Sequence, residues 1–176
     1  MSTENNGGGL NSRRTKRNTH DIAMMILAAG MATRSTCSRR AVGCVLTKAR
    51  KVVSTGYNGV PAGLAHCIET EPLNNAAGSC IRCSHAEINA ISQADGPIDS
   101  AYCTDQPCLN CLRALMNMGV QKIYYWRPYK DVDRENFMVE YSHMFTTHDR
   151  GTGPLVFLEI KNERLSQLME NIVNAS

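Results

Sequence analysis

The sequence predicts an α/β fold, a three-layer α/β/α sandwich in which helices cover both faces of a mixed five-stranded sheet. Segments rich in β-branched and aromatic residues alternate along the chain with segments whose apolar residues recur at helical spacing. With 176 residues, the chain is long enough for one domain with a real core and too short for two. We therefore expect a single domain over residues 19–176, preceded by a tail.

The first part of the chain predicts a tail, a buried helix and a hairpin. Residues 1–18 combine glycine, asparagine and a basic cluster with almost nothing to bury, and are predicted to be a disordered basic tail. Thr19 offers an N-cap to a helix that continues to about Arg34. Two short valine-containing segments, 41–46 and 52–57, are separated by charged residues and predict a β-hairpin.

The second part predicts a long loop and then a regular alternation of helices and strands. Residues 59–79 are rich in glycine, proline and asparagine, and a loop of this length is typical of a functional or metal-fastened segment. Capping and breaking residues then predict helices at 84–93, 107–119, 135–145 and 162–174 and strands at 101–104, 121–126 and 155–160.

Charge and cysteine usage narrow the class of protein. The tail carries four basic residues and one acidic residue, Glu4, so it accounts for the whole net charge of +3. The predicted domain is therefore neutral and is not expected to bind nucleic acid. Eight cysteines, several of them in C-x-x-C pairs or beside histidines, favour metal binding in a reducing compartment over a disulfide framework. We expect a cytoplasmic protein.

An apolar run from Ile22 to Ala32 follows the basic cluster and has the length of a signal peptide core. His20 and Asp21 at its start argue against that alternative. The run is also shorter than the roughly 20 apolar residues that a transmembrane helix needs, so no contact with a membrane is expected.

The most informative motif is His85-Ala86-Glu87 followed by Pro107-Cys108-Leu109-Asn110-Cys111. His85, Cys108 and Cys111 supply three zinc ligands and leave one position open, as in a catalytic zinc site. Both halves of the motif lie at predicted helix starts, where free N–H groups stabilise thiolates. The pattern H-x-E and P-C-x-x-C is the signature of zinc-dependent deaminases.

Glu87 is the candidate catalytic residue, because it is a carboxylate that the metal does not need. In the predicted reaction it transfers a proton from a zinc-activated water to a ring nitrogen, and then to the departing amine. The expected result is hydrolytic deamination of an aminopyrimidine or aminopurine. A structural zinc knuckle or two buried cysteines would explain Cys108 and Cys111 alone, but neither needs His85 and Glu87.

Beyond the motif, the chain resembles the deoxycytidylate (dCMP) deaminases of bacteria and phages. The resemblance spans roughly residues 20–130, and its most selective part is Gly56-Tyr57-Asn58-Gly59 with Pro61 and Gly63. It is also carried by the stretch Arg34 to Gly43, by Asn89-Ala90-Ile91 and by both halves of the metal motif.

The resemblance implies a cytidine deaminase-like fold and conversion of dCMP to dUMP, which supplies thymidylate synthesis. It also implies a homo-oligomer, often a hexamer, that is activated by dCTP and inhibited by dTTP. The segment formed by Gly56, Tyr57, Asn58 and Gly59 resembles the part of the family that lines the regulatory nucleotide site.

Four residues are candidate substrate contacts. Asn58 has an amide that both donates and accepts, which suits a deoxyribose, although Asn-Gly is also a turn sequence. Arg39, with Arg40 beside it, suits a 5′-phosphate, although a solvated basic corner explains both arginines equally well. Ala86 lies within the motif, and Trp126 ends its predicted strand, where sheet packing is the alternative.

A second, structural zinc is predicted from four further cysteines. Cys80 and Cys83 have the spacing of a zinc half-site, and positions matching Cys37 and Cys67 carry zinc ligands in some phage enzymes that the chain resembles. His66 competes for one of the four places, and buried thiols are the alternative interpretation. Cys44 and Cys103 lie in predicted strands and are expected in the core.

Two other functions fit parts of the sequence. A tRNA or single-stranded DNA deaminase uses the same zinc chemistry but needs a basic track for phosphates. Acidic residues near the carboxyl terminus, including Glu159, Glu163 and Glu170, argue against such a track. A noncatalytic zinc- or nucleotide-binding module is also possible in principle, but it has no use for Glu87 as a general base.

Overall fold

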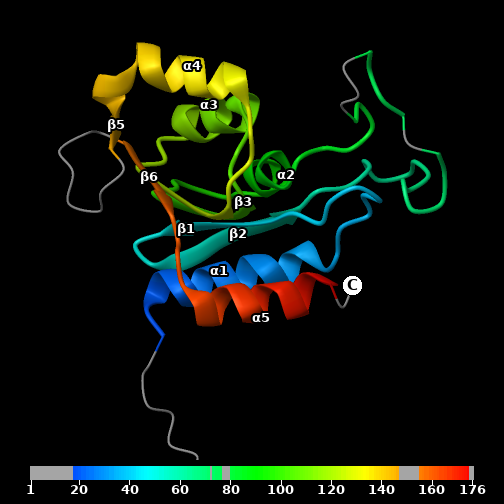
Figure 1. The fold of residues 1–176 in the computed structure, drawn as a ribbon, viewed down its shortest axis with the longest axis horizontal. Helices are drawn as coiled ribbons and strands as arrows, with labels where there is room; N and C mark the ends of the chain where they lie inside the picture. Colours follow the sequence, from blue (N-terminus) through cyan, green and yellow to red (C-terminus); the bar gives the residue numbers. More distant parts are fainter. Residues whose placement is uncertain (1–17, 72, 77–79, 147–154, 175–176) are drawn as a thin grey trace, which may run out of the picture.

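A computed structural model describes residues 18–71, 73–76, 80–146 and 155–174 (Figure 1). The predicted tail lies outside the described residues, except for its last position, Asn18. The elements in chain order are α1 (His20–Ala32), β1 (Gly43–Lys48), β2 (Lys51–Tyr57), α2 (Ala86–Ser92), β3 (Ser100–Asp105), α3 (Leu109–Asn117), β4 (Lys122–Arg127), α4 (Val132–Glu140), the 3₁₀ turn η1 (Ser142–Met144), β5 (Phe145–Thr146), β6 (Leu155–Glu159) and α5 (Glu163–Asn174).

The strands form one mixed sheet in the order β2-β1-β3-β4-β6-β5. The hairpin partners β1 and β2 are antiparallel, β1 is also antiparallel to β3, and β3, β4 and β6 are parallel. Helices α1 and α5 cover one face of this sheet, and α2, α3 and α4 cover the other (Figure 1). The predicted α/β/α sandwich is confirmed, and all five predicted strands are present.

The region predicted as a helix over 135–145 differs from the prediction at both ends. Helix α4 begins earlier, because the side chain of Asp131 accepts a hydrogen bond from the N–H of Arg134 and so caps it. The helix ends at Glu140, and Phe145 pairs with Leu155 to form a sixth strand at the sheet edge. An edge strand of two residues leaves no periodic pattern that a sequence can show.

The sheet separates two apolar cores. On the face of α2 and α3, the core includes Leu112, Leu115 and Ile123, together with Cys44 and Cys103. Both cysteines are fully buried, with 3.7 Å between their sulfur atoms, so their predicted place in the core is confirmed. No helix in the described part of the chain is long and apolar enough to cross a membrane.

On the face of α1 and α5, the second core is built around stacked aromatic rings. The rings of Tyr102 and Tyr124 lie 4.9 Å apart, and Met25 and Met169 pack in the same cluster. Side chains of a strand alternate between its two faces, so β4 sends Ile123 to one core and Tyr124 to the other. The predicted N-cap of α1 is also confirmed, since Thr19 accepts a hydrogen bond from Ile22.

Helix α2 lies unusually close to β2, and Gly56 makes this approach possible. A Cβ atom at Gly56 would lie 2.3 Å from the carbonyl oxygen of Ala86 and 2.5 Å from the nitrogen of Ala90. The amide of Asn89 in turn donates to the carbonyl oxygen of Tyr57 at 2.8 Å. The start of α2, where the metal motif begins, is therefore fixed directly against the sheet.

Candidate metal and catalytic site

Three side chains from the starts of two helices converge on one point. His85 is the N-cap of α2, Cys108 is the N-cap of α3, and Cys111 lies in the first turn of α3. The Nδ1 atom of His85 lies 3.3 Å from the sulfur of Cys111 and 3.4 Å from that of Cys108. All three ligand atoms lie within 4.8 Å of one another.

These distances fit a tetrahedral zinc ion. Nitrogen and sulfur ligands at their usual zinc bond lengths lie about 3.6 Å apart around such an ion. Cys111 is buried, Cys108 is half-buried and His85 is exposed, so the group opens toward solvent on one side. Three protein ligands with an open side match a catalytic site, since structural zinc sites are closed by four.

The electrostatics of the group favour a thiolate at Cys108. A hydrogen bond from Cys111, with a further one from the ring of His85, lowers the pKa of Cys108 to about 4. The same contact with Cys108 raises the pKa of Cys111 above its ordinary value. Zinc binds cysteine as the thiolate and histidine through a neutral ring nitrogen, so binding of zinc releases the protons that these ligands still carry.

Glu87 lies in the first turn of α2, next to the three ligands but outside their set. Its side chain is almost completely buried, with a relative exposure of 4%. Burial raises the pKa of Glu87 to about 7, so both its protonated and its ionised form are accessible near neutral pH. A carboxyl group of this pKa is suited to take up a proton and deliver it within one reaction cycle.

Asn58 lies at the centre of a hydrogen-bonded turn. Its Oδ1 accepts from the hydroxyl of Ser35 at 2.7 Å and from the N–H of Val42 at 2.8 Å, and its Nδ2 donates to the carbonyl of Arg40 at 2.7 Å. The side chain is buried and ties the segment after α1 to the end of β2. This role needs no ligand, and contact of Asn58 with a nucleotide stays a prediction.

The other residues of the predicted regulatory segment are also engaged in packing. Gly56 faces α2, and Gly59 exchanges backbone hydrogen bonds of 3.1 and 2.8 Å with Ser84. Tyr57 is half-buried. Ala86, a predicted substrate contact, is fully buried at the start of α2. These contacts explain why small residues stand at Gly56 and Ala86 whether or not a nucleotide binds nearby.

The two neighbouring arginines have different surroundings. Arg39 is exposed, and its Nη1 lies 3.5 Å from the Oδ1 of Asn74. The Nε of Arg40 lies 2.6 Å from the buried carboxylate of Asp105, and its guanidinium lies over the ring of Tyr129. Arg40 is thus held by protein groups, whereas Arg39 presents its charge at the surface.

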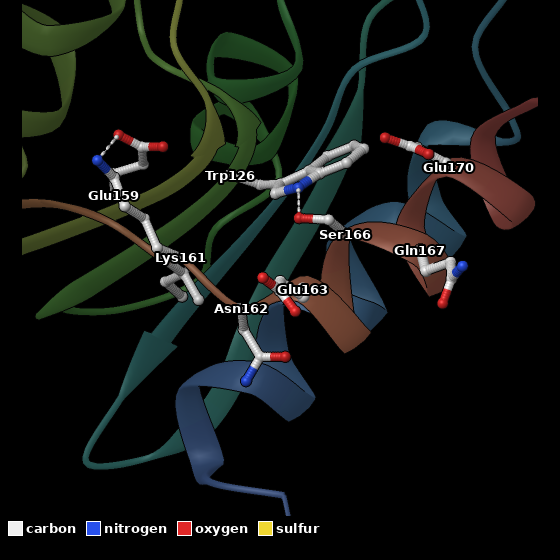
Figure 2. A pocket seen from close by; sticks show the side chains of 9 residues that line it. Trp126, Glu159, Lys161, Asn162, Glu163, Ser166, Gln167 and Glu170 are labelled. Carbon is white, nitrogen blue, oxygen red and sulfur yellow. Dashed lines mark hydrogen bonds and ion pairs between the residues drawn. The ribbon is translucent and has the colours of Figure 1, made fainter.

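Trp126 lies on the sheet face opposite the metal ligands. Its indole lines a pocket of about 500 Å³ beside α5. The indole Nε1 donates to the hydroxyl of Ser166 at 3.1 Å (Figure 2). The guanidinium of Arg127 covers the ring at 4.9 Å. The structure does not bring Trp126 together with His85 and Cys108, so we leave it out of the proposed substrate contacts.

A second group of cysteines lies in the long loop before α2. The sulfur atoms of Cys67, Cys80 and Cys83 lie within 4.8 Å of one another, and those of Cys67 and Cys83 are 3.4 Å apart. The thiol of Cys37 is a further hydrogen-bonding neighbour of Cys83. His66 is not part of the group, and its backbone N–H donates to Glu69. The structure thus brings together three of the four predicted cysteines, places Cys37 beside Cys83, and leaves the competing histidine outside the group.

Two residues outside the predicted site hold the start of α3. Asp131 and Arg134 contact the backbone on both sides of Cys108. The sequence Asp131-Val132-Asp133-Arg134 contains an N-cap signal that could have indicated the true start of α4. Nothing in the sequence shows that the same residues reach α3.

Fold and site together define a class of α/β proteins in which a histidine and two cysteines hold a catalytic metal beside a buried carboxylate. A family model described as the cytidine and deoxycytidylate deaminase zinc-binding region matches residues 18–127. The match covers more than half of the chain and includes both halves of the metal motif. The chain belongs to this family.

The individual proteins with similar sequences include deoxycytidylate deaminases. The deoxycytidylate deaminase of Schizosaccharomyces pombe is 38% identical over 120 residues, which cover 62% of this chain and 37% of that protein. The deoxycytidylate deaminase of Mycobacterium phage D29 is 34% identical over 113 residues, which cover 56% of this chain and 88% of that protein. The chain spans less than half of the length of the S. pombe and Saccharomyces cerevisiae deaminases that it matches.

Among solved structures, the dCMP deaminase of the cyanophage S-TIM5 in complex with dCMP and dUMP is similar with a TM-score of 0.59. Its sequence is 28% identical, and the match covers 78% of this chain and 93% of that one.

Proposed function

We propose that this chain hydrolyses dCMP to dUMP and ammonia. The observation that carries the proposal is a fully buried Glu87 with a pKa of about 7, beside an open group of His85, Cys108 and Cys111. The chain is a member of a deaminase family, and relatives from yeast and phage carry the name deoxycytidylate deaminase. If Glu87 served only as a member of a buried polar network, its carboxyl group would not need a pKa near 7.

In the proposed mechanism, His85, Cys108 and Cys111 bind zinc through one nitrogen and two sulfur atoms. When bound, zinc supplies Lewis acidity that brings the pKa of a coordinated water to about 7. Glu87 accepts the proton of the attacking water and donates it to the ring nitrogen of cytosine. The oxygen of the water bonds to the ring carbon that carries the amine. Glu87, ionised again, takes the proton of this new hydroxyl group and delivers it to the amine, so that the C–N bond breaks, one water is consumed and one ammonia is released.

The rest of the proposed binding site follows from the surface groups. Arg39 is the candidate for the 5′-phosphate, because its guanidinium lies at the surface and its planar fork of donors suits a phosphate group. Asn58 and Ala86 are both buried, and they are proposed to shape the site rather than to supply its charge. Regulation by dCTP and dTTP at residues 56–59 is proposed on the family resemblance alone.

We also propose a structural zinc bound by Cys37, Cys67, Cys80 and Cys83. The support is the convergence of these thiols in a long loop that leads directly to His85. Two zinc ions per chain in metal analysis of the purified protein would agree with this proposal, and one would overturn it. We further propose that the chain forms a homo-oligomer, such as a hexamer, in the cytoplasm. There it would supply dUMP for thymidylate synthesis.

The substrate is tested by following ammonia loss in the ultraviolet from dCMP, deoxycytidine, dCTP and a cytosine-containing oligonucleotide. We expect turnover of dCMP and little of the other three. Turnover of the oligonucleotide alone would favour a polynucleotide deaminase, for which the tRNA-specific adenosine deaminase of Buchnera aphidicola, 26% identical over 104 residues, is a precedent. No turnover of any of the four would leave a noncatalytic zinc protein.

A further inference from the structure

Arg134 is an unexpected residue in the interior of the protein. It belongs to the first turn of α4, and its side chain is only 2% exposed. Arginine is almost never fully buried unless its charge and its N–H groups are satisfied. Its nearest carboxylate, that of Glu135, is 3.8 Å away and largely exposed, so an ion pair does not explain the burial.

The guanidinium of Arg134 instead binds two backbone carbonyl groups. Its Nη1 donates to the oxygen of Pro107 at 3.0 Å, and its Nη2 donates to the oxygen of Tyr129 at 2.6 Å. Pro107 is the residue immediately before Cys108. A planar guanidinium with a fixed fork of donors is well suited to hold two carbonyl groups in one geometry.

Asp131 holds the other side of the same cysteine. Its Oδ2 accepts from the N–H of Leu109 at 2.8 Å, while its Oδ1 accepts from the N–H of Arg134 at 3.0 Å. The carbonyl of Pro107 and the N–H of Leu109 belong to the two peptide groups that flank Cys108. Fixing both peptide planes fixes the φ and ψ of Cys108, which are −69° and 169°.

We propose that Asp131 and Arg134 are positioning residues for the catalytic metal, acting through the backbone of Cys108. The direction of the Cys108 side chain follows from its φ and ψ, and its sulfur lies 3.4 Å from the Nδ1 of His85. Without the hydrogen bonds from Asp131 and Arg134, the start of α3 frays. The sulfur of Cys108 then no longer keeps its distance from the other two ligand atoms. The inference rests on the metal site of the proposed function, but not on its substrate.

The test compares the zinc affinity of three variants, measured by competition between the protein and a zinc-binding chelator. Asp131→Ser keeps an oxygen for the cap of α4 but is too short to reach Leu109 as well. Arg134→Met removes the bonds to both carbonyls. Thr19→Ala is the control, because it removes the N-cap of α1 on the opposite face of the sheet. All three are expected to lower the melting temperature.

We expect zinc affinity at one site per chain to fall about 10- to 100-fold in Asp131→Ser and Arg134→Met, and to stay unchanged in Thr19→Ala. Unchanged zinc affinity in a folded Asp131→Ser protein would overturn the proposal, even if Arg134→Met fails to fold. Equal losses in all three variants would also overturn it, because the effect would then follow stability alone. If the unaltered protein binds zinc but does not deaminate dCMP, the proposed substrate fails while this comparison still stands.

Discussion

The two cysteine groups differ in what holds their ligands in place. His85, Cys108 and Cys111 belong to the starts of helices that pack on the sheet, and their backbone is fixed from several sides. Cys67, Cys80 and Cys83 lie in a long loop, where the described residues form only two isolated bridges, between Asn74 and Cys80 and between Gly59 and Ser84. The first group is thus organised by the fold, whereas the second is suited to organise its own segment when a metal binds.

The largest expected effect is on turnover, in a variant that tests the chemistry of the first group without changing its metal ligands. Glu87→Gln removes the carboxyl group that is proposed to transfer protons but leaves the three proposed metal ligands in place. We expect dCMP turnover to fall by roughly 10²- to 10⁴-fold, the usual contribution of a general acid and base. Zinc content, measured by atomic absorption, is expected to stay the same, and its loss would show that Glu87 contributes to the metal site instead.

A pair of ligand substitutions sharpens the comparison between the two groups. Cys83→Ser is expected to lower stability by on the order of 3 kcal/mol, about 10 °C in melting temperature for a chain of this size, because its loop depends on the metal. Cys108→Ser is expected to abolish turnover with a smaller thermal shift, because α3 is held by its own packing. Calorimetry with zinc analysis of both variants decides this, and the reverse order of thermal shifts would contradict it.

A substitution at the close contact between β2 and α2 is expected to have a smaller effect, and on stability alone. Gly56→Ala places a Cβ atom against the backbone at Ala86 and Ala90, and is expected to cost about 1–3 kcal/mol. Gly30→Ala is the matched control, since a Cβ atom there meets nothing within 4 Å and lies on a helix. There we expect a gain of up to about 1 kcal/mol in urea unfolding. Equal effects of both variants would show that α2 moves easily.

The smallest expected effect is on the pH dependence of stability. Burial by itself would raise the pKa of Asp131, but hydrogen bonds from the N–H groups of Arg134 and Leu109 lower it below its ordinary value. A lowered pKa in the folded state stabilises the protein above the unfolded value near 4, and this contribution is lost as the pH falls through the folded value. Urea unfolding between pH 5 and 3 should therefore change less steeply in Asp131→Asn.

Much of the fold could be predicted because its signals are local. The N-cap at Thr19, the apolar periodicity of α1 and the valine-rich strands each lie within a few neighbouring residues. The turn between β1 and β2 shows the limit, since Ala49 and Arg50 both have positive φ although neither is glycine or asparagine. The carboxylate of Asp99, 50 residues away, accepts from the N–H of Ala49 at 2.7 Å and supports that turn.

By itself, the sequence predicted His85, Cys108 and Cys111 as zinc ligands and Glu87 as the carboxyl group beside them, because residue types at short spacing carry that chemistry. Only the tertiary structure decided which other residues lie near these groups. Trp126 lies on the opposite face of the sheet, and the amide of Asn58 is hydrogen-bonded within a turn. Asp131 and Arg134 bind the backbone on both sides of Cys108. The physical reason is that such contacts join residues far apart in the chain, and their partners exist only once the sheet and its two helical layers have packed.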